Sequence, residues 1–505
     1  MNPHLSSAGI AGTRLVEFIL FAAFMVWQVV RLSDALHIFQ LEGYKRGRFL
    51  SWCRMNPRRA AFITAPPAKK PLVMTSRARR ILVTAALMSI AIIVVAAAAI
   101  SASSAVELTA ELVLFVVLIV LTPLVVVAAD ALLTPVQRSI NGMYLRRARA
   151  KLNDVDPVVI AVAGSFGKTS TKFAIAALIG ESEEVLATPG SFNTPLGVCR
   201  TINEQLESKH RFFVVEMGAY KRGDIAELCR FVRPTVGVLT SIGPAHLERF
   251  GSMDVIRQAK YEVIDELAAG GTGVMNVDDP VVRALADDTK KVRVVRFGSE
   301  PEGRPDVSAT DVSIDKTGTS MTIHADGATA TLPTRLLGRY AISHVLAGVA
   351  VARALDQPLE TVAQRAGSIA PVEHRLQLIE GAGGVTVIDD AFNSNPDGAS
   401  AALEVLASMP ANKRVVVTPG IIELGPMQEK ANHAFGAHVA RVADVALFVA
   451  RTNRDALSAG ARESGSDTKV ITVDTLAEAT EHLKTVLAPG DVVLFENDLP
   501  DQYEN

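Results

Sequence analysis

The stretch Gly164–Ser170 has the residue types and spacing of a phosphate-binding loop, Gly-Ser-Phe-Gly-Lys-Thr-Ser. A β-rich apolar run, 158–163, precedes it and a helical pattern, 172–179, follows it. Glycines in such a turn let backbone N–H groups face phosphate oxygens, and the helix N-terminus adds partial positive charge. Lys168 can reach the terminal phosphates and the Thr169 hydroxyl can bind Mg²⁺. The spacing is Gly-x-x-Gly-Lys-Thr, two residues shorter than the common pattern.

Two polar residues follow the next apolar runs along the chain. Glu216 ends the run 212–215, and His246 follows the run 236–240. Because the carboxyl ends of parallel strands face one crevice, both side chains could meet the phosphate loop. Alone, His246 is more often a capping or packed histidine, and Glu216 is equally ambiguous. Lys260 lies in a helical pattern, 254–267, and by itself is typical of a solvated surface lysine.

Composition excludes several classes of protein. The chain has 505 residues, with 51 Lys+Arg against 53 Asp+Glu, and this balance argues against a nucleic-acid-binding protein. Hydrophobic residues make up 49%, which excludes wholesale disorder. Cys53, Cys199 and Cys229 are too widely spaced for a disulfide framework or a zinc cluster.

The mean hydropathy of +0.27 and the apolar runs of the first third predict a membrane region over residues 1–150. We expect transmembrane helices near 15–32, 81–100 and 112–129, each close to the ~20 residues that span a bilayer. Basic residues are concentrated between the first two segments and after the third. This bias predicts a multi-pass cell-membrane protein whose catalytic domains are cytoplasmic. The basic loop could also contact anionic lipid headgroups, or could be a topology signal only.

From Val158 onward the sequence predicts an α/β protein with two domains. Short apolar runs alternate with helical patterns, which is typical of parallel sheets. Strands are expected at 158–163, 212–215, 236–240, 385–388, 414–418, 445–449, 470–473 and 492–495. A hydrophilic stretch near 300–332 predicts a β-hairpin elaboration. We place a central phosphate-loop ATPase-like domain at 151–335 and a C-terminal Rossmann-like domain at 336–505.

Several stretches resemble the Mur ligase family, the ATP-dependent ligases that build the peptidoglycan stem peptide. They are AGSFGKTSTK, PGSFNTPLGV, VVEMGAYKRGDI, TSIGPAHLERFGSMDVIRQAKYEV, NVDDP, EHRLQLIE and IDDAFNSNPDG, with ELG at 423–425. Together they cover roughly 158–493, and three of them look most like the branch that adds D-alanyl-D-alanine to a muramyl tripeptide. The resemblance implies a carbon–nitrogen ligase that forms an acyl phosphate from a substrate acid and ATP. An amino acid or dipeptide amine then attacks it.

The resemblance also assigns residues to roles. ATP would be held by Gly164, Ser165, Gly167, Lys168, Thr169, Ser170, Arg375 and Asp390. Two Mg²⁺ would be bound by Thr169, Glu216, His246 and Lys260, the last as a carbamate formed with CO₂. Asn193, Thr194, Asn393 and Asn395 would line the substrate side. Lys168, Lys260 and His246 are the expected catalytic residues.

The sequence departs from the family pattern in three places. The predicted membrane region replaces the family's soluble domain that grips the UDP-sugar, so a lipid-linked or otherwise carried envelope precursor becomes plausible. The family's Gly-x-His-Asn-x-x-Asn segment is here 338–344, in which Tyr340 could stack on adenine and His344 could form a hydrogen bond. Ala391 replaces the usual serine or cysteine. The acidic ending 495–498, where this branch usually has a Lys-Gly-Ser-like segment, is interpreted as a solvated tail.

Three alternatives stay open at this stage. One is a related ligation on another envelope polymer, such as polyglutamate-like synthesis. Another is a membrane-anchored phosphate-loop ATPase or binding module without ligation, which would not call for a carbamate on Lys260. The third is a non-catalytic scaffold derived from a ligase, which Ala341 and Ala391 motivate and which Lys168, Lys260 and Arg375 argue against.

Overall fold

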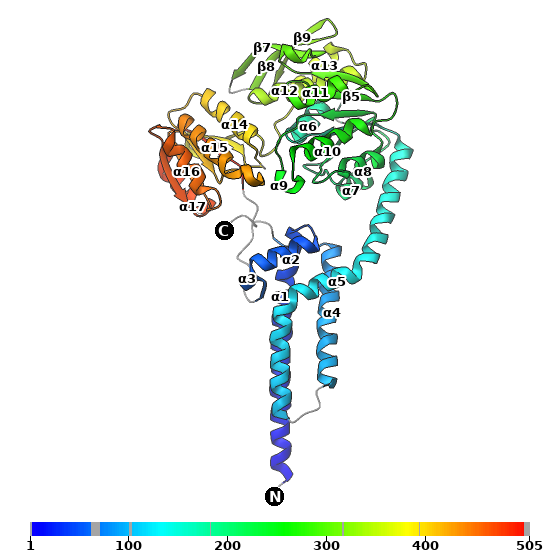
Figure 1. The fold of residues 1–505 in the computed structure, drawn as a ribbon, viewed down its shortest axis with the longest axis vertical. Helices are drawn as coiled ribbons and strands as arrows, with labels where there is room; N and C mark the ends of the chain where they lie inside the picture. Colours follow the sequence, from blue (N-terminus) through cyan, green and yellow to red (C-terminus); the bar gives the residue numbers. More distant parts are fainter. Residues whose placement is uncertain are drawn as a thin grey trace. The chain divides into compact units, whose positions relative to one another are not determined.

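The structure is a computed structural model that describes residues 3–61, 71–99, 104–181, 183–315, 318–392 and 394–498. It divides into two compact units, Met1–Met143 and Tyr144–Asn505, which we call the N-terminal unit and the C-terminal unit (Figure 1).

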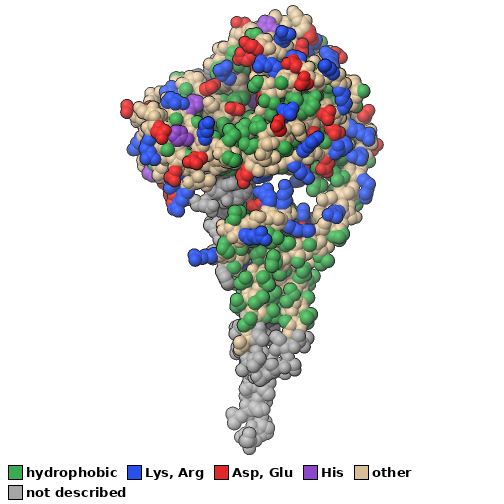
Figure 2. All heavy atoms as spheres, viewed as in Figure 1, with side chains coloured by type: hydrophobic (Ala, Val, Ile, Leu, Met, Phe, Trp, Pro, Cys, Tyr) green, Lys and Arg blue, Asp and Glu red, His purple; other side chains and the backbone are tan. Residues whose placement is uncertain are grey.

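The N-terminal unit is helical. Its helices are α1 (Pro3–Leu41), α2 (Arg46–Met55), α3 (Pro57–Ala61), α4 (Ser76–Ala99) and α5 (Ser104–Val155), the last of which continues into the other unit. Leu36 and Phe39 of α1, Phe49 of α2, Ile81 of α4 and Val126 of α5 form its buried core. Apolar side chains also cover much of the visible outer face of this unit, and Lys and Arg gather at one end (Figure 2).

The prediction of a multi-pass cell-membrane protein is wrong. Two described segments, Ser76–Ala96 and Val113–Val155, are long and apolar enough to cross a membrane, and two such helices are weak evidence. The predicted span 15–32 lies in α1, which does not meet that test over its described residues. Two of its polar residues lie in the protein interior: Gln28 donates to Ser89 at 3.3 Å, and Arg31 donates to the Ala60 carbonyl at 2.7 Å.

The C-terminal unit contains two sheets, and the first has nine strands in the order β2-β3-β1-β4-β5-β6-β7-β8-β9. Neighbours from β2 to β7 are parallel, and β7, β8 and β9 are antiparallel, as expected for a hairpin elaboration. The strands are β1 (Val158–Ala163), β2 (Val185–Ala187), β3 (Phe212–Glu216), β4 (Val236–Leu239), β5 (Thr272–Asn276), β6 (Arg293–Phe297), β7 (Val307–Asp315), β8 (Gly318–Ala325) and β9 (Ala328–Thr334).

Helices cover both faces of this sheet, which explains why its central strands β1, β3 and β4 are almost wholly buried and apolar. In β1, Ile160 and Val162 face a core shared with α6, whereas Ala161 and Ala163 face a core shared with α7, α8 and α10. The helices are α6 (Lys168–Ile179), α7 (Pro195–Gln205), α8 (Asp224–Val232), α9 (Leu247–Phe250), α10 (Met253–Asp265), α11 (Pro280–Asp288), α12 (Arg339–Ala354) and α13 (Leu359–Arg365), with 3₁₀ turns η1 (Pro301–Gly303) and η2 (Ala366–Ser368).

The second sheet has six strands in the order β10-β11-β15-β12-β13-β14, parallel except for β10. Its strands are β10 (Gln377–Glu380), β11 (Thr386–Asp390), β12 (Arg414–Thr418), β13 (Val445–Val449), β14 (Lys469–Val473) and β15 (Val492–Glu496). They pack with α14 (Pro396–Ser408), α15 (Gln428–Val442), α16 (Arg454–Glu463) and α17 (Leu476–Val486), with 3₁₀ turns η3 (Ala382–Gly384) and η4 (Gly425–Met427). The predicted α/β class with parallel-rich sheets is confirmed.

Residues just after 335 pack with the first sheet, although the sequence-based division assigns them to the C-terminal domain. Val345 and Leu346 of α12 and Val362 of α13 share the core of Ile160 and Leu178. The domain boundaries at 150 and 335 stay predictions.

Candidate functional site

The loop between β1 and α6 has the backbone of an anion-binding turn. Gly164 has φ 150° and Gly167 has φ 74°, conformations that favour glycine. A Cβ on Gly164 would lie 2.0 Å from the Thr240 hydroxyl oxygen, so no side chain fits there. Lys168 Nζ donates to the carbonyls of Gly164 at 2.9 Å and Ser165 at 3.1 Å. The lysine therefore lies over the loop at the start of α6.

A cavity of about 400 Å³ joins this loop to both domains of the C-terminal unit. It brings together Ser165, Gly167, Lys168, Thr169, Ser170, Asn193, Glu216, His246, Lys260, Arg375 and Asn395 among the sequence-predicted residues. Gly164, Thr194 and Asp390 do not line it, and Asn393 lies outside the described residues. Most of the predicted polar residues thus share one cavity.

Glu216 links the elements of this cavity from the end of β3. The carboxylate is almost fully buried and accepts from the Thr169 hydroxyl at 2.8 Å and from Asn193 Nδ2 at 3.0 Å. Lys172 Nζ lies 3.3 Å from the same carboxylate and also donates to the Gly190 carbonyl. Sequence reasoning missed Lys172, although it lies one helical turn after Lys168 and could have been found by that spacing.

Replacing Lys172 with methionine should lower the free energy of unfolding by about 3 kcal/mol, because it removes the buried cation beside Glu216. Urea denaturation followed by circular dichroism measures this change. Lys290→Met, at an exposed position, is the control and should be nearly neutral. Equal stability of the two variants would contradict the assigned ion pair.

His246 meets an acidic residue from the other domain. It directly precedes α9 with φ 55°, and its Nδ1 lies in close contact with the Glu423 carboxylate. Arg249 donates to the same carboxylate, and these partners lower the pKa of Glu423 against the raising effect of its burial. Sequence reasoning noted the ELG segment and missed this contact, because Glu423 and His246 are 177 positions apart.

Lys260 is not a solvated surface lysine. It is 2% exposed on α10, and its Nζ lies 3.5 Å from the Ala219 carbonyl and 5.4 Å from the centre of the Phe250 ring. Burial and the nearby positive charge of Lys168 hold its pKa well below the usual value, although Asp224, Glu262 and Glu216 oppose this shift. The side chain therefore favours a neutral amine more than an ordinary lysine does.

The second domain contributes a basic and an acidic group next to the loop. The Arg375 guanidinium lies 4.7 Å from the centre of the Phe392 ring. Asp390, at the end of β11, accepts from the Leu376 N–H at 3.1 Å. Beside it, Glu496 is fully buried at the end of β15 and accepts from the Ser394 hydroxyl. The interpretation of 495–498 as a solvated tail is therefore wrong at Phe495 and Glu496, which complete the sheet.

A smaller cavity of about 100 Å³ lies beside the loop and is lined by Gly167, Tyr340, His344, Arg375 and Asp390. His344 Nδ1 is 2.9 Å from the Thr171 hydroxyl, so α12 supports the first turn of α6. Burial, together with the positive charge of Arg375, lowers the pKa of His344 to about 4 from 6.5.

The low pKa of His344 predicts a pH dependence of stability. Between pH about 4 and 6.5 the unfolded chain binds more protons at this residue than the folded chain. The free energy of unfolding should therefore rise with pH in this window, and the contribution should be complete above it. His344→Asn should reduce this slope in urea denaturation at pH 5 and 7. An unchanged slope would contradict the buried neutral imidazole.

The predicted substrate residues fall into two groups. Asn193 and Asn395 line the larger cavity, and Asn395 also caps α14 by accepting from the Gly398 N–H at 2.9 Å. Thr194 instead caps α7, where its hydroxyl accepts from the Gly197 N–H at 3.3 Å. These contacts fix the helix starts that border the cavity.

The residues present fit one Mg²⁺ directly. The Thr169 hydroxyl and the Glu216 carboxylate are hard oxygen donors held 2.8 Å apart. A second Mg²⁺ at His246 and Lys260 requires two changes. His246 has to leave its contact with Glu423, and Lys260 has to lose its positive charge, because an ammonium repels a cation. Over the described part of the chain, no three His, Cys, Asp or Glu side chains are grouped to hold a metal.

Two family matches cover the C-terminal unit. Residues 162–352 match the Mur ligase middle domain, and residues 374–496 match the Mur ligase, glutamate ligase domain.

Individual relatives and solved structures agree with these matches. The chain is 36% identical over 362 residues to UDP-N-acetylmuramoyl-tripeptide–D-alanyl-D-alanine ligase of Mycobacterium tuberculosis, covering 67% of this chain and 70% of that protein. The Escherichia coli protein of the same name is 30% identical over 335 residues, covering 66% and 74%. MurF from Acinetobacter baumannii superimposes with a TM-score of 0.64 at 26% identity, covering 72% of this chain and 78% of that one. MurF ligase from Thermotoga maritima in complex with ADP gives 0.61 at 28% identity, covering 71% and 80%.

Proposed function

The chain belongs to the Mur ligase family, and on this premise we propose that it joins D-alanyl-D-alanine to the carboxylate of a muramyl tripeptide. It is an ATP-dependent, amide-forming ligase of peptidoglycan synthesis that uses Mg²⁺. The observation that supports this ligase chemistry most strongly is the cavity in which Lys168, Glu216 and Lys260 meet residues of the second domain.

The proposed reaction has two bond-forming steps. The substrate carboxylate attacks the γ-phosphorus of ATP, the bond to the β-phosphate oxygen breaks, and ADP leaves. The amine then attacks the acyl carbon, loses a proton, and inorganic phosphate leaves as the amide forms. Both reactants of the first step are anions, so Lys168 and Arg375 offset charge at the site of attack. Thr169 and Glu216 would hold a Mg²⁺, which would supply further charge neutralisation.

Lys260 is proposed to carry a carbamate. A neutral amine adds CO₂ and releases one proton, which gives an anion that suits a hard cation. The support is the environment of this lysine. Burial lowers the pKa of its amine, and so does the neighbouring cation Lys168. A carbamate anion at this position would instead attract Lys168.

Two differences from the relatives concern the substrates. About a third of this chain lies outside its match to the relative, so the UDP group as carrier of the muramyl peptide is part of the proposal. Ala391 lacks the hydroxyl or thiol of the family pattern, and Glu496 lies beside Ser394 at the cavity's edge.

An ADP-release assay with paired acids and amines tests the proposal. We expect release to require both UDP-muramyl tripeptide and D-alanyl-D-alanine, with a product mass equal to their sum minus water. Product formation with glutamate in place of the dipeptide would favour the alternative of a polyglutamate-like ligation. ATP hydrolysis without any acid dependence would contradict ligation itself.

A further inference from the structure

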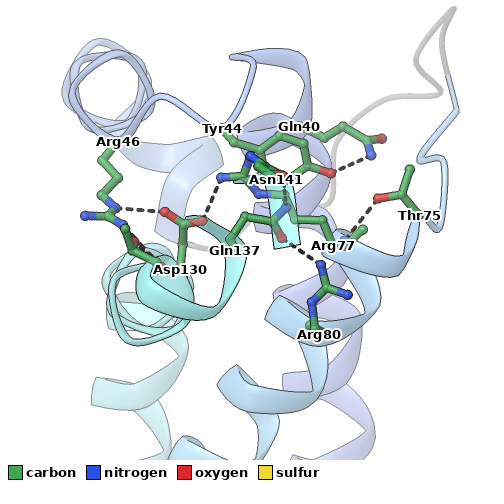
Figure 3. A network of polar contacts seen from close by, with 11 residues as sticks. Gln40, Tyr44, Arg46, Thr75, Arg77, Arg80, Asp130, Gln137 and Asn141 are labelled. Atoms are coloured by element: carbon green, nitrogen blue, oxygen red, sulfur yellow. Dashed lines mark hydrogen bonds and ion pairs between the residues drawn. The ribbon is translucent and has the colours of Figure 1, made fainter. Parts of the chain in front are cut away.

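We propose that the N-terminal unit contains a binding site for a phosphate or diphosphate group, formed by arginines of three helices. This inference concerns residues of the N-terminal unit alone and does not rest on the proposed function. The site is a cavity of about 400 Å³ lined by Tyr44, Arg46, Arg77, Asp130, Thr134, Gln137, Arg138 and Asn141. Figure 3 shows most of these side chains converging from separate helices.

One carboxylate organises the arginines. Asp130 is buried on α5 and accepts from Arg46 Nε at 2.8 Å through one oxygen and from Arg77 Nη2 at 2.9 Å through the other. Arg46 also donates to the Asp130 carbonyl at 3.1 Å and to the Thr134 hydroxyl. Figure 3 shows Arg46 and Asp130 held face to face in this way. Both guanidinium groups are therefore fixed in place rather than free to extend into solvent.

Further contacts fix the side chains that line the cavity. Tyr44 stacks under Arg77, whose guanidinium carbon lies 4.2 Å from the ring centre, and Gln40 donates to the Tyr44 hydroxyl at 2.9 Å. On the opposite wall Arg80 donates to Gln137 at 2.6 Å, and Gln137 donates to Asn141 at 2.7 Å. A rigid wall of donors reduces the entropy lost when a ligand binds.

The charges of the lining residues do not balance. Three arginines, Arg46, Arg77 and Arg138, face the cavity with Asp130 as its one carboxylate. In addition, the Nε–H of Arg77 is buried without a hydrogen-bond partner in the described structure, and such orphan donors are rare. An anion in the cavity would compensate the excess positive charge.

The chemistry of the donors selects the class of anion. Guanidinium groups present planar pairs of N–H donors that match phosphate oxygens bidentately. The side chains of Tyr44, Thr134 and Asn141 add neutral polar groups that a phosphate ester or diphosphate can use. The group could belong to a soluble phosphate ester or to a lipid headgroup, and the experiment separates these sources.

The full-length chain carrying Lys168→Ala, which removes the cation of the phosphate loop, is titrated with inorganic pyrophosphate by calorimetry. Adding Arg77→Gln or Arg138→Gln should weaken pyrophosphate binding by about tenfold or more. Arg138 is exposed and makes no contact with Asp130 that the fold needs, so its variant separates ligand binding from folding. Arg79→Gln, on the same helix as Arg77 but outside the cavity lining, is the matched control.

Sedimentation with vesicles distinguishes the two sources. Binding to phosphatidylcholine vesicles that contain phosphatidic acid, lost in Arg77→Gln and competed by pyrophosphate, would assign the site to a lipid phosphate. Pyrophosphate binding without any preference for these vesicles would assign it to a soluble phosphate. The proposal is overturned if neither probe binds, or if Arg79→Gln weakens binding as much as Arg77→Gln does.

Discussion

Lys168→Ala should lower ligase turnover at saturating acid and amine by about a thousandfold and weaken ATP binding severely. Lys168 begins α6, and its Nζ is held over the phosphate loop by the carbonyls of Gly164 and Ser165. In this position the ammonium can offset the charge that passes to the leaving phosphate. Loss of one preorganised charged donor costs about 10²–10³ in turnover in comparable sites, and weaker ATP binding adds to this.

The matched control for this variant is Lys209→Ala. Lys209 is an exposed lysine paired with Glu207 at 3.3 Å, and it does not line the cavity. Its variant should therefore retain full activity. Steady-state ADP release and calorimetric ATP titration measure both effects. An unchanged ATP affinity in Lys168→Ala, with intact circular dichroism, would count against the loop assignment.

Lys260→Ala should abolish ligation, and a small carboxylate such as acetate should restore part of it. The deleted side chain leaves space in the buried site between Ala219 and Phe250, where a carboxylate can take the place of the proposed carbamate. We expect at least a hundredfold loss of turnover and a recovery that increases with acetate concentration.

Two variants separate rescue from a general effect of salt. Lys168→Ala should not respond to acetate, because the missing group there is a cation. Lys484→Ala, at an exposed position on α17, should be as active as the parent with or without acetate. Full activity of Lys260→Ala without acetate would contradict a role for the carbamate.

The sheets could be predicted from sequence because their strands are buried on both faces. Val158–Ala163 and Val445–Val449 are continuous apolar runs, and Arg414–Thr418 has three consecutive valines at its centre. The structure has strands with these bounds. The strands β2, β5, β6 and β10 were not predicted. β2 has three residues, and β5, Thr-Gly-Val-Met-Asn, has few apolar positions to mark it.

The candidate site was predictable where its residues lie in local motifs. Lys168 and Thr169 follow from the strand–loop–helix pattern, and Glu216 from its place at a strand end. The contacts of Glu423 with His246 and Arg249 depend on tertiary packing across 177 and 174 positions, which no local pattern encodes. The burial of Lys260 is likewise a property of α10 packed under Ala219 and Phe250.

The N-terminal unit was predicted less well than the sheets. Its apolar runs predicted three membrane spans. Two of them lie in segments of α4 and α5 that are long and apolar enough to cross a membrane, whereas the third, 15–32, lies in α1, which does not meet that test over its described residues. In the structure Leu32, Leu36 and Phe39 of α1 are buried among residues of α2, α4 and α5. The polar residues Gln28 and Arg31 are satisfied by neighbouring helices, so periodicity within one helix could not reveal their partners.

Transfer of oxygen from the acid to phosphate is the most direct test of ATP-driven acid activation in this cavity. The muramyl tripeptide is labelled with ¹⁸O in its reacting carboxylate, and the released phosphate is examined by mass spectrometry or ³¹P NMR. An acyl phosphate leaves one of the acid's oxygens on phosphorus, so we expect one ¹⁸O in each phosphate released during amide formation. Phosphate without the label, formed at the same rate as the amide, would contradict the mechanism.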